Sequence, residues 1–216
     1  MSSHLITTLY SGTATYSAQP STQMNLAPTL IEKASLHAFS QMSQESVAKI
    51  KVELVKQINT LNENSPDIID SINTSELDRI LKDDSKTNYS LVTLDAENKI
   101  EGFILARESQ ESSSNKAPES VKVVFIEKLV IIKQSDRQRG LGTTFLHSIA
   151  KCSKQNNVNE IRLLVYKANR AAITFYFNRG FDYVDKKFDE QWDAYLLKVS
   201  PETLLERTSE AVLILK

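Results

Sequence analysis

Apolar residues recur along this chain at two spacings, one typical of helices and one typical of strands. Helical spacing is clearest over residues 43–61, where one stripe contains Val47, Ile50, Leu54, Ile58 and Leu61. A second helix is predicted over residues 74–84, with Thr74 or Ser75 as its cap and acidic residues in its first turn. Further helices are predicted from the glycine pair at 140 and 142 to about residue 156, and over residues 170–180, where Gly180 ends the helix.

Strand-forming runs lie between these helices. They predict strands at 29–35, 121–132, 160–167, 181–188 and 192–200, and a hairpin over 89–109 that turns at 95–98. Residues 110–120 read as a polar loop. The resulting order, β-α-α-β-β-β-α-β-α-β-β, indicates an α/β fold built on a mixed sheet.

The two ends of the chain are interpreted as extensions of the main domain. Residues 1–28 contain no Lys, Arg, Asp or Glu, and we interpret them as a flexible N-terminal extension that contributes little to the core. The alternative is an added strand, because the run LITTLY at residues 5–10 contains β-branched residues. The main domain is predicted over residues 29–200, and residues 201–216 form a C-terminal extension that starts as a short helix at Pro201.

Composition narrows the classes of function. A length of 216 residues indicates one domain, and a net charge of -1 argues against nucleic-acid binding. The single cysteine, Cys152, excludes an internal disulfide and fits a reducing, cytoplasmic compartment. No apolar run approaches the roughly 20 residues of a membrane span. The three histidines and Cys152 form no pattern of metal ligands, so no metal is expected.

The stretch RQRGLGTTFLHSIA, residues 137–150, carries the strongest chemical pattern. A strand runs into a turn with Gly140 and Gly142, and the turn opens a helix. The first backbone N–H groups of a helix have no intrahelical partner and lie at the positive end of its dipole, so this turn is suited to phosphate. An ordinary glycine-containing turn with solvated arginines explains the stretch equally well. A P-loop would need a following Lys, and a dinucleotide fingerprint would need a glycine where Phe145 stands.

These residues resemble the coenzyme-A loop of the GNAT N-acetyltransferase superfamily, R/Q-x-x-G-x-G/A. Arg137, Gly140 and Gly142 fill that pattern. Downstream, NRAAITFYFNRGF is similar to the family's N-x-x-A-x-x-F-Y-x-x-x-G-F, matched by Asn169, Ala172, Phe175, Tyr176, Gly180 and Phe181. The resemblance covers roughly residues 29–200. It implies a twisted mixed sheet with helices on both faces, in which two adjacent parallel strands splay apart.

The resemblance also implies a site for acetyl-CoA. The pantetheine would pair with the backbone of Val130, Ile131 and Ile132 as an added strand does. The pyrophosphate would rest on the loop and the helix start, whose residues are Arg137, Gln138, Arg139, Gly140, Leu141, Gly142 and Thr143. Asn169 would hydrogen-bond the cofactor or orient the substrate, or it would cap the following helix, and these roles are compatible.

Catalytic roles follow from the same resemblance. Tyr176 stands where family members place the general acid, and a phenol with an ordinary pKa of about 10 is protonated at neutral pH. Ring packing is its alternative role. Glu127 lies near where other members keep a base, and a water relay is an equal alternative. Members that acetylate ribosomal protein N-termini carry a Glu five residues before the Asn, where this chain has Leu164, so that substrate is disfavoured.

The expected activity is acetyl transfer from acetyl-CoA to a primary amine, on a small molecule or on a peptide or protein, by direct attack in a ternary complex. The alternative is a non-catalytic acyl-CoA-binding or partner-recruiting module with the same fold. A homodimer is compatible with either function.

Overall fold

A computed structural model describes residues 7–8, 35–65, 71–81, 89–112, 120–132, 140–184 and 193–213. The strands are β1 (Thr7–Thr8), β2 (Ser35–Ala38), β3 (Leu91–Leu94), β4 (Ile100–Ser112), β5 (Ser120–Ile131), β6 (Glu160–Tyr166), β7 (Asp182–Tyr183) and β8 (Ala194–Val199). The helices are the 3-10 turn η1 (Phe39–Gln41) and the α-helices α1 (Gln44–Asn64), α2 (Thr74–Leu81), α4 (Leu141–Gln155), α5 (Arg170–Phe177) and α6 (Pro201–Leu213).

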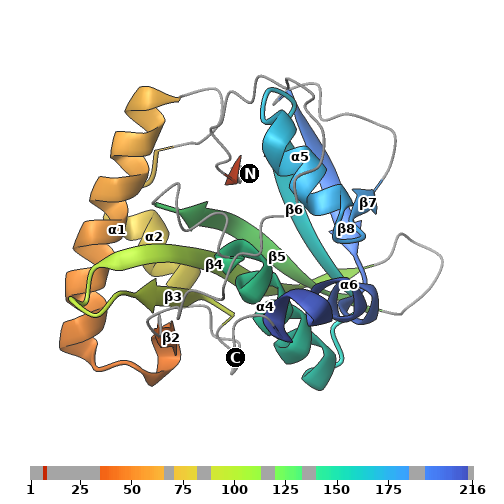
Figure 1. The fold of residues 1–216 in the computed structure, drawn as a ribbon, viewed down its shortest axis with the longest axis horizontal. Helices are drawn as coiled ribbons and strands as arrows, with labels where there is room; N and C mark the ends of the chain where they lie inside the picture. The colour runs from red at the N-terminus through yellow and green to blue at the C-terminus, as the bar shows by residue number, and fades with distance from the viewer. Residues whose placement is uncertain are drawn as a thin grey trace, which may run out of the picture.

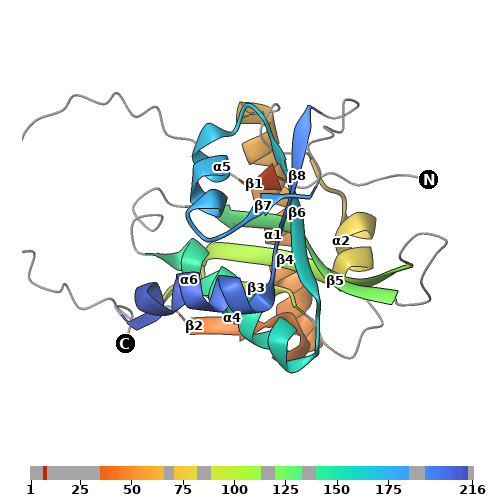
Figure 2. The same cartoon turned by 90° about the vertical axis from the view of Figure 1, so that its right-hand side faces the viewer.

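One mixed sheet organises the molecule. Its strand order is β2-β3-β4-β5-β6-β8-β7, and β1 is added beside β5. β5 and β6 run parallel, whereas the other neighbours along this order run antiparallel. Helices α1 and α2 pack on one face, and α4, α5 and α6 pack on the other, so each face has its own apolar core (Figure 1; Figure 2). The predicted fold class is confirmed.

The stripe predicted for the first long helix faces the sheet. α1 begins after Ser43, whose hydroxyl oxygen accepts a hydrogen bond from the Ser46 N–H at 3.2 Å. Every member of the stripe is buried or packs against one core cluster, and these members are Val47, Ile50, Leu54, Ile58 and Leu61. Because residues four apart share a side of a helix, the sequence spacing alone was sufficient to find this face.

Several predicted boundaries were wrong. The first strand of the main domain was expected to end at residue 35, but β2 (Ser35–Ala38) continues to Ala38; the rest of the predicted strand, residues 29–34, lies outside the described residues. Asn73, rather than Thr74 or Ser75, caps α2, because Asn73 Oδ1 accepts from the Glu76 N–H at 2.9 Å. β4 continues to Ser112, inside the predicted polar loop, since it stays paired with β5 as far as Ser120. Ladder hydrogen bonds join backbones, so polar residues remain in a strand when the neighbouring strand is present.

The C-terminal helix α6 packs against α4 on the second face of the sheet. Leu204 is fully buried in the core there. His147 Nδ1 lies 3.0 Å from Thr208 Oγ1, which joins the two helices by a hydrogen bond. Burial, with Lys151 as a second cause, lowers the pKa of His147, so its ring is neutral at neutral pH.

Candidate functional site

The parallel strands β5 and β6 pair over only part of their length. Backbone pairing runs from Val123 opposite Glu160 to Ile126 opposite Leu163 and then stops. Beyond that point each strand stays paired with its outer neighbour, β5 with β4 as far as Ile131, and β6 with β8 as far as Tyr166. The two central strands therefore splay apart, as the resemblance implied.

A β-bulge lies where the splay begins. Leu105 pairs with Lys128 and Ala106 pairs with Ile126, so Glu127 is an additional residue on β5. A bulge bends its strand and increases the local twist. The bend at Glu127 accounts for the separation of β5 from β6 directly after Ile126.

Glu127, predicted as a base, is held by an ion pair. Glu127 is only 2% exposed. Arg107 Nε on β4 donates a hydrogen bond to Glu127 Oε1 at 2.5 Å. The Arg107 guanidinium also lies 5.9 Å from the centre of the Phe125 ring. A buried carboxylate needs such a partner, and this one fixes the Glu127 side chain next to the splay.

The short strand β1 occupies part of the splay. Thr7 and Thr8 pair in parallel with Lys128 and Leu129 of β5, directly after the bulge, and β1 also contacts β6 (Figure 1). This matches the alternative that we weighed for the N-terminal segment, an added strand. The backbone edge of β5 thus accepts an extended chain directly before residues 130–132, where the resemblance puts pantetheine.

Beyond the bulge, the backbone N–H and C=O groups of successive β5 residues point alternately toward β4 and toward the splay. The Ile132 N–H donates to the Glu101 carbonyl oxygen at 2.9 Å, which directs the Ile132 amide toward β4. In an antiparallel ladder the next residue, Ile131, then directs its N–H and C=O to the opposite side. Of the three predicted backbone positions, Ile131 is the one directed into the splay, and Leu129 shares that direction.

The two glycines at the start of α4 serve different purposes. Gly140 has a φ of 80°, and an added Cβ would meet no atom within 4 Å, so glycine is favoured there by its backbone conformation. At Gly142 an added Cβ would lie 3.0 Å from Phe175 Cζ on α5. Gly142 therefore allows close packing of α4 on α5, and this contact explains the glycine without reference to a ligand.

The first turn of α4 presents Leu141, Gly142 and Thr143, whose N–H groups precede the first intrahelical bond, from the Thr144 N–H to the Gly140 carbonyl oxygen. The helix dipole adds positive potential there, which suits an anion. The other predicted loop residues, Arg137, Gln138 and Arg139, lie outside the described residues.

Helix α5 and its N-cap provide the other two predicted residues. Asn169 is 1% exposed, and its Oδ1 accepts from the Ala172 N–H at 3.1 Å, so its capping role is present. Tyr176 is fully buried. Its ring meets those of Phe175 and Phe181 edge to face, with ring centres 5.2 and 5.1 Å apart. The ring therefore packs in the core on the face of the sheet that α4 and α5 cover.

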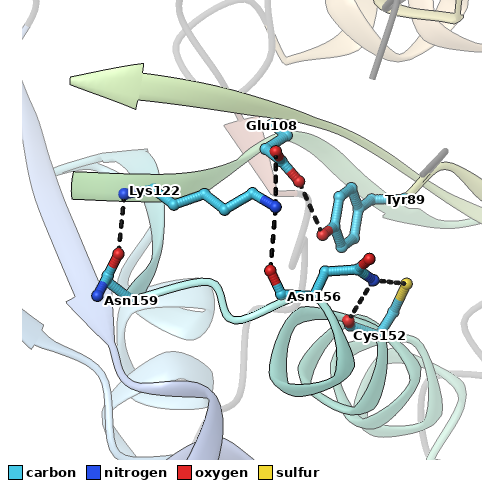
Figure 3. A network of polar contacts seen from close by, with 6 residues as sticks. All are labelled: Tyr89, Glu108, Lys122, Cys152, Asn156 and Asn159. Atoms are coloured by element: carbon cyan, nitrogen blue, oxygen red, sulfur yellow. Dashed lines mark hydrogen bonds and ion pairs between the residues drawn. The ribbon is translucent and has the colours of Figure 1, made fainter. Parts of the chain in front are cut away.

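A polar network holds the far end of α4 against the sheet (Figure 3). Glu108 Oε2 accepts from the Tyr89 hydroxyl at 3.1 Å, and Glu108 Oε1 lies 3.0 Å from Lys122 Nζ. Lys122 Nζ also donates to the Asn156 carbonyl oxygen at 3.0 Å, placing a positive charge at the negative end of the helix dipole. Burial, and then the Glu108 carboxylate, raise the pKa of Tyr89. The network thus joins the C-terminal end of α4 to β4 and β5.

Cys152 belongs to the edge of this network and not to the splay. Asn156 Nδ2 donates to the Cys152 carbonyl oxygen at 2.8 Å and lies 3.7 Å from Sγ. Burial is the main cause that raises the pKa of the thiol above its usual range, which disfavours the thiolate. Among the described residues, no group of three or more His, Cys, Asp or Glu side chains is placed to hold a metal ion.

Comparison with known proteins gives the family. The model described as "Acetyltransferase (GNAT) family" matches residues 57–181, more than half of the chain. The chain belongs to the GNAT acetyltransferase family. No curated protein sequence matches it significantly. Within the described residues, no helix has the length and apolar character needed to cross a membrane.

Solved structures share the fold at low sequence identity. Naa50 of Arabidopsis thaliana, in complex with the bisubstrate analogue CoA-Ac-MVNAL, is 20% identical over 77% of this chain and 98% of its own, with a TM-score of 0.53. NAA60 of Arabidopsis thaliana, in complex with acetyl-CoA, is 13% identical over 78% and 99%, with a TM-score of 0.56. A GNAT-family acetyltransferase of Staphylococcus aureus Mu50 is 16% identical over 77% and 98%, with a TM-score of 0.54.

Proposed function

We propose that this chain transfers the acetyl group of acetyl-CoA directly to a primary amine while both substrates are bound. Family membership supports acetyl transfer, and the relatives Naa50 and NAA60 were solved with a CoA analogue and with acetyl-CoA. The observation that carries the proposal is the splay of β5 from β6 beside the first turn of α4. An extended ligand with a phosphate at one end fits this combination of a strand edge that has separated from β6 and a helix start.

The residues of the chain then have distinct roles. The N–H groups of the first α4 turn bind the pyrophosphate, with Arg137 and Arg139 adding charge, and the backbone of Ile131 pairs with the pantetheine. Acetyl-CoA supplies the activated thioester. Tyr176 donates a proton to the departing thiolate, and Glu127 accepts the proton of the attacking amine, directly or through water.

The acceptor is a primary amine of a small molecule, a peptide or a protein. The Naa50 structure contains a CoA analogue joined to the peptide sequence MVNAL, and the NatC complex was solved with a Gag peptide and CoA. Peptide α-amines are therefore the first acceptors to test. Leu164 stands in place of the Glu of members that acetylate ribosomal proteins, so peptides from ribosomal N-termini serve as a comparison set.

The test is release of free thiol from acetyl-CoA against a panel of peptides, lysine derivatives, polyamines and small amines, with calorimetric titration of acetyl-CoA in parallel. We expect micromolar to millimolar binding and thiol release that depends on an amine. Binding without release for any amine would favour the non-catalytic acyl-CoA-binding module. No binding of acetyl-CoA by the folded chain would contradict both functions.

Strand β1 and pantetheine compete for one edge in this proposal. Removal of residues 1–28 should therefore raise acetyl-CoA affinity by a few-fold, because apparent affinity is reduced by the fraction of molecules whose site is closed. The melting temperature should change little, since two residue pairs join β1 to β5. A variant with Thr7 and Thr8 replaced by proline should show the same rise in affinity as the deletion. The control variant, with Thr13 and Thr15 replaced by proline, should match the wild type. Weaker binding after removal would show that the segment supports the site.

A further inference from the structure

Arg179 joins the start of α4 to the end of α5. It follows α5 in the chain, and its Nε and Nη2 donate to Thr143 Oγ1 at 3.0 and 2.5 Å. Its Nη1 donates to the Phe175 carbonyl oxygen at 2.9 Å. Thr143 is the third residue of α4 and is 3% exposed. One guanidinium therefore binds the first turn of α4 and the last turn of α5 together.

The ring of Phe175 reinforces this join. The guanidinium carbon of Arg179 lies 3.7 Å from the ring centre, within the range of a cation–π contact. On the α4 side, a Cβ at Gly142 would be 3.0 Å from Phe175 Cζ, so the ring packs directly on the helix start. Phe175 is thus fixed by α4 and by Arg179.

Tyr176 follows Phe175 in the same helix, and the two rings meet edge to face with centres 5.2 Å apart. Both side chains belong to one close-packed core cluster. Close-packed protein interiors transmit small displacements between contacting side chains. A shift of the first α4 turn relative to Phe175 would therefore move the Tyr176 hydroxyl.

We propose that Arg179 is a positioning residue that sets the place of the Tyr176 hydroxyl relative to the phosphate-binding turn of α4. This inference rests on the proposed acetyl transfer. In that reaction the cofactor phosphates bind at α4 and the proton donor Tyr176 is on α5. The thioester sulfur of acetyl-CoA therefore comes within reach of the Tyr176 hydroxyl only when the two helices are correctly spaced. Arginine suits this task because its planar fork binds two acceptors at once, whereas lysine offers a point charge without the fork.

Two substitutions test this role, Arg179→Lys and Thr143→Val, each removing the fork contact while keeping side-chain volume similar. We expect kcat to fall by about 10- to 100-fold, since misplacement by an ångström is sufficient for a loss of that order. The KM and Kd for acetyl-CoA should stay within about threefold, because the backbone donors of α4 remain. The matched controls are Arg162→Lys, which alters the Arg162 contact with Glu160 on β6, and Thr208→Val on α6, and both should keep kcat.

A double variant separates positioning from a structural role. Combined with Tyr176→Phe, Arg179→Lys should lower kcat little beyond the single Tyr176→Phe change, because the hydroxyl that Arg179 positions is already absent. If the two substitutions lower kcat by multiplying factors, the positioning role is overturned. A rise in the KM for acetyl-CoA alone would also overturn it, in favour of direct phosphate binding. A lower melting temperature with unchanged kcat would reduce Arg179 to a structural contact. If the wild type shows no amine-dependent thiol release, the proposed function itself fails, and this inference fails with it.

Discussion

Replacing Gly142 with valine is expected to displace the start of α4 and to weaken acetyl-CoA binding. An added Cβ would already lie 3.0 Å from Phe175 Cζ, and valine adds two further carbons in this contact. Overpacking of this kind destabilises a core by about 1–3 kcal/mol, which lowers the melting temperature by about 2–12 °C in a domain of this size. Loss of one backbone hydrogen bond to a charged phosphate, about 1.5–3 kcal/mol, would weaken binding by about 10- to 150-fold.

Two companion variants locate the cause of this effect. Gly140→Ala meets no atom within 4 Å, so it should show only the strain of its φ of 80°, about 1–2 kcal/mol. Adding Phe175→Leu to Gly142→Val makes room for the new methyl groups and should restore part of the melting temperature and of the affinity. If Gly142→Val abolishes binding without lowering the melting temperature, and Phe175→Leu restores nothing, then the glycine provides space for the ligand and not for Phe175.

The glycine pair shows what the sequence was able to predict. Its spacing after a strand and before a helix located the turn correctly, because turn chemistry is encoded locally. The reason for Gly142 was not visible in the sequence, because it depends on Phe175, which is 33 positions away in the chain and adjacent only after folding. Arg179 was overlooked for the same reason, although it stands inside the matched motif beside Gly180.

For the strands, too, local features were predictable from the sequence and tertiary features were not. The alternation in residues 160–166 produced a strand with alternating burial, and the stripe of α1 faced the core as predicted. The bulge at Glu127 was not predicted, because one extra residue in a continuous strand-forming run leaves the pattern of apolar positions almost unchanged. The pairing of β1 inside the splay is a tertiary contact, which local propensity in LITTLY favoured without specifying the partner strand.

Among the candidate site residues, Asn169 has the contact that its local sequence predicted. The Asn169 cap follows from an Asn placed before a helix. The catalytic roles of Tyr176 and Glu127 remain predictions, because burial and ring contacts fit both a packed tyrosine and a proton donor. Measurement of turnover decides between those roles.

Replacing Tyr176 with phenylalanine is expected to lower kcat by about 100- to 10,000-fold, the usual contribution of a general acid or base. A donor that meets the sulfur only as the C–S bond breaks stabilises the transition state and not the bound cofactor. Acetyl-CoA affinity should therefore change by no more than a few-fold. Phenylalanine keeps the ring, and with it the edge-to-face contacts with Phe175 and Phe181, so the fold should be retained.

Tyr89→Phe is the matched control. Tyr89 is 1% exposed and belongs to the same core cluster, but its hydroxyl donates to Glu108 near the far end of α4 (Figure 3). Its loss should lower the melting temperature, because Glu108 loses a donor, and should leave kcat unchanged. Steady-state kinetics with an acceptor amine found in the thiol-release panel, together with calorimetric titration of acetyl-CoA, measures both variants. A Tyr176→Phe protein with near wild-type kcat would identify the ring as a packing residue, and a parallel collapse of affinity would make Tyr176 a cofactor-binding residue instead.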